Sequence, residues 1–158
     1  MWTVQLDSVE QTQLFGKTLG QVAVAGTVIA MNGELGAGKT AMSQGIGRGL
    51  GIEGPITSPT FIILAVYDTG RLTLFHADLY RLGDGSELLE LGLDEAWLGE
   101  GLSVVEWSDK FPEELPSDRL DLTLSYHDTL ENSRILNVAP QGPRSASLSE
   151  ELSEIFCG

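Results

Sequence analysis

The sequence has little cysteine and little basic charge, and each shortage excludes a class of protein. Of its 158 residues one is a cysteine, Cys157, so neither an internal disulfide nor a cysteine-based metal site can form. Nine Lys and Arg stand against 23 Asp and Glu, for a net charge of −14. Direct nucleic-acid binding depends on clustered cations that neutralise phosphates. We therefore expect no direct binding of DNA or RNA, and an acidic surface that favours a basic protein partner.

Long apolar runs are also missing. The apolar stretches fall far short of the roughly 20 residues that cross a bilayer, and Met1–Glu10 lacks the basic start and apolar run of a secretory signal. With a single cysteine, these features predict a cytoplasmic protein with no membrane segment. The length fits one domain, which we expect over residues 1–140. A linker at Pro140–Ala146 and a short helix opened by Ser147 and Glu150 are expected in the tail, 141–158.

Hydrophobic periodicity and turn residues predict alternating helices and strands. Helices are expected at Ser8–Val24 and Lys39–Leu50, with a buried strand at Thr27–Met31 between them. Shorter helical segments are expected near 86–91 and 94–97. The other expected strands are Phe61–Tyr67 and Leu72–Leu79, which form a hairpin through Asp68–Gly70, then Leu102–Glu106, and an antiparallel pair around Leu120–Leu124 and Leu136–Val138. This order predicts an α/β domain with a mixed, partly antiparallel central sheet.

Gly33–Thr40 reads G-E-L-G-A-G-K-T, which fits the phosphate-loop pattern G-x-x-x-x-G-K-[ST] at every required position. Glycines allow successive backbone N–H groups to turn inward, and the N-terminus of the following helix adds to the anion site. Lys39 is placed to contact the β- and γ-phosphates, and the Thr40 hydroxyl is placed to bind Mg²⁺. The motif predicts a P-loop NTPase-like three-layer domain that binds ATP or ADP with Mg²⁺.

Several other residues are candidates for the same site. Asp78 ends a strand, where such folds hold magnesium directly or through water. Glu106 ends another strand and is a candidate for orienting the attacking water or for binding the metal, against the alternative of a solvated edge residue. Ser58–Thr60 is either a switch that orders on binding or a proline-stiffened turn. His76 is expected to be a packed strand residue, and Trp107 a core or rim aromatic.

Together these motifs resemble a known family, the TsaE (YjeE-type) ATPases, which are required for threonylcarbamoyladenosine modification of bacterial tRNA. The resemblance covers about residues 5–138. One departure is Thr40-Ala41, where many members have two threonines. The segments that carry the resemblance are G-E-L-G-A-G-K-T (33–40), S-P-T-F (58–61), H-A-D-L-Y-R-L (76–82), E-L-L-E-L-G-L (87–93) and V-E-W (105–107).

The resemblance implies roles for individual residues. Magnesium would be surrounded by Thr40, Asp78 and Glu106, and the catalytic group would be Lys39, Asp78, Glu106 and Thr60. The nucleotide would be bound by Gly33, Glu34, Leu35, Gly36, Ala37, Gly38, Lys39, Thr40, Ala41, Ser58, Trp107 and Arg134. The family is thought to bind the TsaD–TsaB pair, which modifies adenosine 37 of tRNA, and to reset it through ATP hydrolysis. Contact with tRNA would be indirect, through that complex.

Three other functions are weighed against this one. A small-molecule kinase would need an arginine-rich lid over the transferred phosphate, and the arginines here are dispersed. A GTPase usually carries an Asn-Lys-x-Asp base-recognition motif, which this sequence does not contain. A nucleotide-gated binding module with negligible turnover remains an open alternative.

Overall fold

The computed structural model describes residues 1–56, 64–83 and 99–157. Their strands form one seven-stranded sheet in the order β1-β7-β6-β2-β5-β4-β3. The strands are β1 (Trp2–Leu6), β2 (Val28–Gly33), β3 (Leu64–Tyr67), β4 (Leu74–Asp78), β5 (Leu102–Glu106), β6 (Arg119–Tyr126) and β7 (Arg134–Gln141). The helices are α1 (Val9–Val22), α2 (Lys39–Gly49) and α5 (Pro143–Phe156), with 3-10 turns η1 (Ser108–Lys110) and η2 (Pro112–Glu114).

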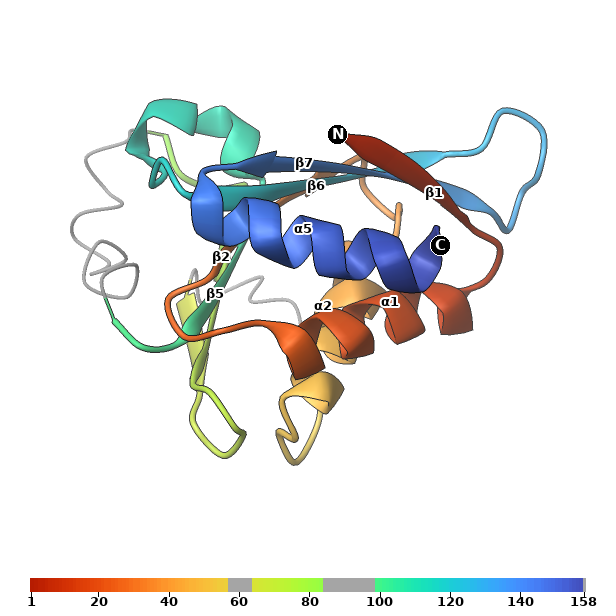
Figure 1. Ribbon diagram of the computed structural model, residues 1–158. Helices are drawn as coiled ribbons and strands as arrows, with labels where there is room; N and C mark the ends of the chain where they lie inside the picture. The colour runs from red at the N-terminus through yellow and green to blue at the C-terminus, as the bar shows by residue number, and fades with distance from the viewer. Residues whose placement is uncertain (57–63, 84–98, 158) are drawn as a thin grey trace.

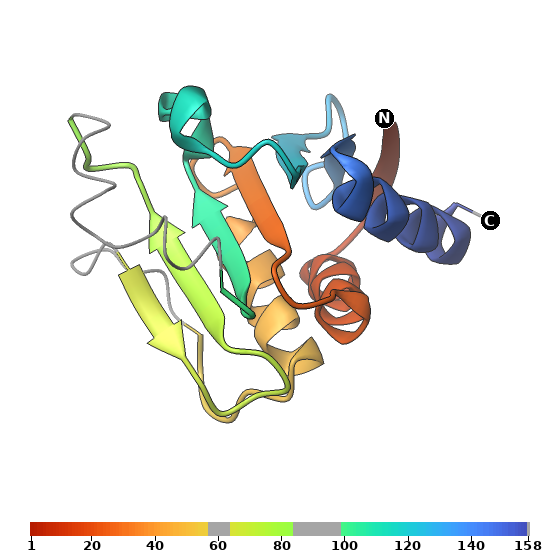
Figure 2. The same cartoon turned by 60° about the vertical axis from the view of Figure 1, so that its left-hand side comes forward.

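The sheet is mixed, as predicted, and β2 divides it into two kinds of pairing. On one side β2 is parallel to β5 and β5 to β4, whereas β3 closes this flank as the antiparallel partner of β4 in the expected hairpin. On the other side β2 is parallel to β6, and β6, β7 and β1 are successively antiparallel. Figure 2 shows β2, β5, β4 and β3 side by side with α2 behind them. The carboxyl ends of β2, β4 and β5 therefore meet at one edge.

Two elements at the ends of the chain differ from expectation. β1 was not predicted, because an alternation of five residues is too short to stand out; it pairs along its whole length with β7. The expected linker at Pro140–Ala146 is wrong. Its first residues complete β7, and α5 begins at Pro143 rather than Ser147. Proline suits this first helical position because its missing N–H has no helical partner there.

A carboxylate that is distant in sequence explains the early start of α5. Its N-cap, Gly142, has no side chain to offer, but Asp118 accepts hydrogen bonds from the backbone N–H groups of Arg144 and Ser145, each at 3.0 Å. The Ser145 hydroxyl also donates to Asp118, at 2.7 Å. These contacts satisfy N–H groups that a helix start leaves without partners.

The helices α1, α2 and α5 gather on one side of β6 and β7 (Figure 1) and share one apolar core with the sheet. α1 and α2 make the closest contact. A Cβ added to Gly49 would lie 2.1 Å from the Lys17 carbonyl oxygen, and one added to Gly45 would lie 2.2 Å from that of Gln13. The two backbones therefore touch, and only glycine fits between them. This contact fixes α2, and with it the loop that precedes α2.

The other face of the β4–β5 flank carries a smaller apolar cluster. Ala77 and Val105 point to this face, because side chains alternate along a strand, and Trp107 and Phe111 pack against them. Lys110 ties η1 to the segment after β4: its ammonium donates to the carbonyl oxygens of Tyr80 and Leu82, at 2.6 and 2.8 Å. The predicted α/β fold with a mixed central sheet is confirmed.

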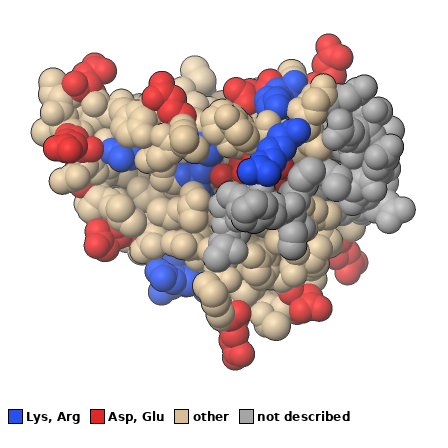
Figure 3. Space-filling model, turned by 180° about the vertical axis from the view of Figure 1, so that it is seen from behind, with Lys and Arg blue, Asp and Glu red and all other residues tan. Residues whose placement is uncertain are grey.

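Some predicted elements fall outside the described residues: Ser58–Thr60, the first part of the Phe61–Tyr67 strand, and the helical segments near 86–91 and 94–97. Among the described residues, no helix has the length and apolar content to span a bilayer. On the face in Figure 3, acidic side chains are scattered around the outline and the basic ones form only small groups. Within the described part of that face there is no continuous basic stripe of the kind that a nucleic-acid backbone requires.

Candidate functional site

The glycine loop lies between β2 and α2, at the carboxyl edge of the parallel strands. Gly36 and Gly38 have φ angles of 80° and 114°, in the region that favours glycine, and the Ala37 N–H closes a tight turn on the Glu34 carbonyl oxygen at 3.0 Å. Gly38 is also the N-cap of α2 and has no side chain to cap it. The first N–H groups of α2 are thus available to an anion, which the helix dipole also favours.

Lys39 places a buried cation beside this helix start. Its side chain is folded back over the loop, where the ammonium donates to the carbonyl oxygens of Gly33 and Glu34 at 2.6 and 3.0 Å. The Trp107 ring lies 4.3 Å from the ammonium. Burial lowers the pKa of Lys39, and the negative charges of Glu106 and Asp78 oppose that shift. Neutral carbonyls compensate this cation only in part, so the arrangement suits an incoming anion.

Two carboxylates face Lys39 from neighbouring strands. Asp78 and Glu106 are register partners at the ends of β4 and β5. Burial raises the pKa of Asp78, the Tyr80 backbone N–H at 2.9 Å opposes the rise, and Glu106 adds to it. Glu106 is 2% exposed, which excludes the alternative of a solvated edge residue. The structure thus brings Lys39, Asp78 and Glu106 together, as the sequence predicted, while their roles stay predictions.

His76 makes a contact that the sequence did not reveal. It is fully buried, as expected for a packed residue, but its Nε2 lies 2.5 Å from Glu106 Oε2. Ser43 Oγ of α2 is 3.5 Å from the same nitrogen. One feature of the sequence could have placed His76 near the site. His76 and Asp78 are two residues apart on β4, so their side chains lie on the same face of the sheet.

Trp107 directly follows Glu106 and has an unusual backbone, with a φ of 58°. This is an uncommon conformation for a bulky residue, and it turns the chain from β5 into η1. Its ring packs against Tyr80, 4.9 Å between centroids, and covers Lys39. Asn32 secures the turn by accepting hydrogen bonds from Ser108 Oγ and the Asp109 N–H, both at 3.0 Å. Trp107 therefore lies at the phosphate loop, where the resemblance placed it.

A pocket of about 360 Å³ opens beside the loop, between the start of α1 and the tip of the β6–β7 hairpin. It is lined by the predicted nucleotide-binding residues Gly36–Gly38, Ala41 and Arg134. Arg134 stacks on the Tyr126 ring at 4.6 Å, and the Tyr126 hydroxyl donates to the Leu35 carbonyl oxygen at 2.7 Å. The pocket is large enough for part of a nucleoside. Sequence reasoning did not assign its other lining residues to the site, since they come from the start of α1 and the β6–β7 tip: Asp7, Ser8, Val9, Glu10, Thr12 and Asn132.

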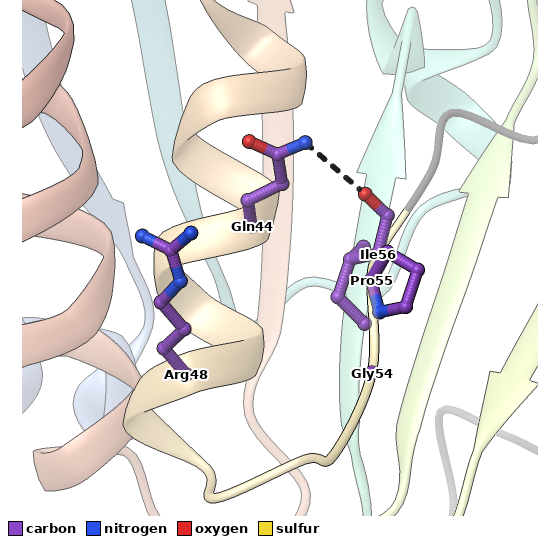
Figure 4. A pocket seen from close by; sticks show the side chains of 5 residues that line it. All are labelled: Gln44, Arg48, Gly54, Pro55 and Ile56. Carbon is purple, nitrogen blue, oxygen red and sulfur yellow. Dashed lines mark hydrogen bonds between the residues drawn. The ribbon is translucent and has the colours of Figure 1, made fainter.

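A second pocket, of about 260 Å³, lies further along α2, and no residue of the phosphate loop lines it. Figure 4 shows Gln44 and Arg48 on one side of it and the segment Gly54–Ile56 on the other. The Gln44 amide donates to the Ile56 carbonyl oxygen at 3.4 Å. This contact ties α2 to the chain just before the predicted switch residues Ser58 and Thr60, which lie outside the described residues.

The predicted magnesium site would have a limited set of protein ligands. In the described ranges, no group of three or more His, Cys, Asp or Glu side chains could hold a metal ion by itself. The predicted oxygen donors that the structure describes are the Thr40 hydroxyl, at the exposed start of α2, and the carboxylates of Asp78 and Glu106. Such a sparse set fits Mg²⁺, which keeps several waters and binds substrate phosphates as well.

Comparison with known proteins decides the family. The profile of the family described as threonylcarbamoyl adenosine biosynthesis protein TsaE matches residues 6–135. The chain belongs to the TsaE family. The TsaE protein of Nostoc is 42% identical to it, over 89% of this chain and 86% of that protein. The TsaE protein of Bacillus subtilis is 40% identical, over 91% and 89%.

A solved structure supports the same assignment. The crystal structure of Bacillus subtilis YdiB is 34% identical and superposes with a TM-score of 0.82, covering 98% of this chain and 95% of that one. The resemblance to TsaE that the sequence motifs suggested is therefore confirmed, and so is the P-loop type of α/β fold. As a TsaE-family member, the chain belongs with proteins of threonylcarbamoyladenosine biosynthesis in tRNA.

Proposed function

We propose that the chain is a magnesium-dependent ATPase that supports modification of adenosine 37 in tRNA, by binding a TsaD–TsaB pair and resetting it through ATP hydrolysis. The observation that carries this proposal is the buried Lys39 ammonium beside an uncapped helix start, with Asp78 and Glu106 close enough to act on its pKa. A cation, free N–H groups and acidic oxygens at one edge match the needs of a magnesium–triphosphate complex.

The residues divide into binding and hydrolytic roles. Lys39 would exchange its loop carbonyls for the β- and γ-phosphates, and the first N–H groups of α2 would bind the same oxygens. Thr40 and Asp78 would hold Mg²⁺, which supplies charge neutralisation on the phosphates. The pocket beside Gly36–Gly38 would take the nucleoside, with Arg134 at its wall.

Hydrolysis needs a group that orients water, and Glu106 is the best placed. It is buried at the end of β5, and its charge acts on Lys39. A carboxylate there would accept a hydrogen bond from the attacking water and align it with the γ-phosphorus. The carboxylate would act by positioning, since phosphoryl transfer requires little covalent chemistry from the protein.

One observation favours a second candidate, a nucleotide-gated binding module with negligible turnover. Lys39 is engaged by the carbonyl oxygens of Gly33 and Glu34 and by the Trp107 ring, contacts that nucleotide binding would exchange for phosphates. A protein that uses this exchange as a conformational signal would bind nucleotide and hydrolyse it slowly. The two candidates share one site and differ in turnover.

The deciding experiment measures ATP turnover by the purified chain, alone and with TsaD and TsaB from the same source, with and without Mg²⁺. The proposal expects magnesium-dependent turnover that the pair increases, and retention of the chain on immobilised TsaD–TsaB that changes with ATP. Nucleotide-dependent retention without turnover would favour the binding module. Phosphate transfer to a metabolite would instead support a kinase, and retention that ignores nucleotide would contradict both leading candidates.

A further inference from the structure

We infer that His76 is a positioning residue, which fixes the Glu106 carboxylate in the orientation that hydrolysis requires. The inference deepens the proposed function and rests on it. His76 Nε2 contacts one carboxylate oxygen of Glu106, so the other oxygen is the freer of the two for water or metal. Glu106 would then enter each turnover already oriented, without losing side-chain freedom at that step.

The geometry comes from the pairing of β4 and β5. His76 is the register partner of Val104, two residues before the partners Asp78 and Glu106, so it reaches Glu106 diagonally across the strands. Both side chains of the pair are buried, with relative exposures of 0% for His76 and 3% for Glu106. Their separation of 2.5 Å marks a direct hydrogen bond. Burial restricts the orientations that both side chains can adopt.

The inference uses one direction of this hydrogen bond, in which Nε2 of His76 donates and Glu106 Oε2 accepts. The other ring nitrogen, Nδ1, is buried and has no hydrogen-bond partner within the part of the chain that the structure describes. A buried polar atom without a partner is destabilising, so an apolar residue would serve packing better. The contact with Glu106 is the feature that an apolar residue could not supply.

The pair is also connected to the phosphate loop. Ser43 of α2 lies one helical turn after Lys39, and its Oγ is 3.5 Å from His76 Nε2. The charge of Glu106 acts in turn on the Lys39 ammonium. His76 therefore contacts α2 through Ser43 and β5 through Glu106. Its substitution should disturb hydrolysis through Glu106 and leave the phosphate-binding groups in place.

The test replaces His76 in three ways and measures kcat, KM and the Kd for ATP, with TsaD and TsaB present. His76→Phe keeps the ring and removes the donor. His76→Gln keeps an N–H near the position of Nε2, whereas His76→Asn is too short to place one there. We expect His76→Phe and His76→Asn to lower kcat by about tenfold or more with Kd changed less than about threefold, and His76→Gln to recover most of the kcat.

Two controls separate positioning from a merely structural role. Ser103→Ala removes a buried hydroxyl that has no hydrogen-bond partner among the described residues, on the same strand as Glu106, and should leave kcat unchanged. In a Glu106→Gln background, His76→Phe should cause no further loss of kcat, because the group that it positions is already gone. Thermal unfolding of each variant shows whether it is folded.

Several results would overturn the inference. These are normal kcat in His76→Phe, equal losses with and without the Glu106 carboxylate, or no advantage of His76→Gln over His76→Asn. The Gln–Asn comparison decides the matter if His76→Phe does not fold. Absence of turnover in the unsubstituted chain, alone and with TsaD–TsaB, would instead overturn the proposed function and this inference together.

Discussion

The two flanks of β2 differ in what they bring to the phosphate loop. On the parallel flank, β4 and β5 deliver polar side chains: Asp78 and Glu106 are their last residues, and His76 is the middle residue of β4. On the antiparallel flank, β6 supports the shape of the loop. A Cβ on Gly33 would lie 2.5 Å from the Leu124 carbonyl oxygen, and the Tyr126 hydroxyl bonds to the carbonyl oxygen of Leu35. One flank carries the candidate chemistry and the other holds the loop in place.

Strand length and pairing explain this division, because β5 and β6 both run parallel to β2. The short strands β4 and β5 end beside the loop, so their terminal side chains converge on it and on the helix start. The antiparallel pair β6–β7 instead runs past the loop and turns back. Its tip, between Tyr126 and Arg134, thereby reaches the wall of the pocket beside Gly36–Gly38. Substitutions on β4 and β5 should consequently change nucleotide binding or hydrolysis. Substitutions in the strands that support the loop on the other flank should mainly change stability.

The largest expected effect is that of Lys39→Ala, at the point where both flanks meet. Loss of the buried ammonium should weaken ATP binding by at least about 100-fold, roughly 3 kcal/mol, because the phosphates lose their one full charge partner in the loop. Isothermal titration calorimetry with ATP and Mg²⁺ measures the loss. The matched control is Lys17→Ala, an exposed lysine on α1, which should bind normally. Near-normal affinity in Lys39→Ala would contradict the proposed site.

The second effect concerns the support of the loop. Gly49→Ala places a methyl 2.1 Å from the Lys17 carbonyl oxygen and should force α1 and α2 apart. Overpacking of this kind costs about 2 to 3 kcal/mol in the free energy of unfolding. Urea unfolding measures it. Gly51→Ala meets no atom within 4 Å, although its φ is 77°, so it should cost only the backbone strain of about 1 to 2 kcal/mol. Equal costs for both variants would contradict the close helix contact.

The third effect is that of Asp78→Asn on the parallel flank, which should weaken function and increase stability. Asp78→Asn should weaken the magnesium dependence of ATP binding by about tenfold, since it removes a charged metal ligand. Burial raises the pKa of Asp78 above 3.8, so ionising it in the folded protein is unfavourable. Stability due to this group therefore falls as the pH rises from 3.8 through the raised value.

The nucleotide-free Asp78→Asn protein should consequently melt at a higher temperature than the unsubstituted one at neutral pH. Differential scanning calorimetry at pH 7 measures this, while ATP titrations with and without Mg²⁺ measure the loss of metal dependence. Asp109→Asn, a carboxylate in η1 whose charge also acts on Lys39, is the control for a simple change of charge. Unaltered metal dependence in Asp78→Asn would remove Asp78 from the set of magnesium ligands.

Sequence reasoning worked best on the parallel flank, where the signals are local. An apolar strand, a glycine loop and a helix follow one another, and Asp78 and Glu106 each end an apolar run. The contact of His76 with Glu106 was missed because it depends on the register of two strands, and the partners are 30 positions apart in the chain. No pattern within either strand shows which diagonal neighbours will meet.

The antiparallel flank was harder to predict, because its features depend on residues far apart in the chain. β1 is paired with β7 near the other end, and Trp2 donates a hydrogen bond to Ser149 of α5. The pocket beside the loop likewise combines the start of α1 with the β6–β7 tip. The start of α5 depends on Asp118, so neither the linker nor the helix boundary could be inferred from residues 140–147 alone.

That distant cap is the basis of the smallest predicted effect, which lies on the antiparallel flank. Burial tends to raise the pKa of Asp118, but hydrogen bonds from Ser145 and Arg144 outweigh it and lower the pKa. The stabilisation is therefore fully present above the ordinary value of 3.8 and is lost as the pH falls through the lowered one. Asp118→Asn should cost about 1 kcal/mol at pH 7, because it removes the charge and one acceptor oxygen from the hydrogen bonds at the helix start, and its difference from the unsubstituted protein should shrink towards pH 2, by urea unfolding. Asp121→Asn, which breaks only a partly exposed pair with Arg119, should cost a few tenths of a kcal/mol. ATP binding should be normal in both variants, because neither residue lines the pocket beside the loop. A loss for Asp118→Asn that persists unchanged at low pH would show that α5 does not depend on this carboxylate charge.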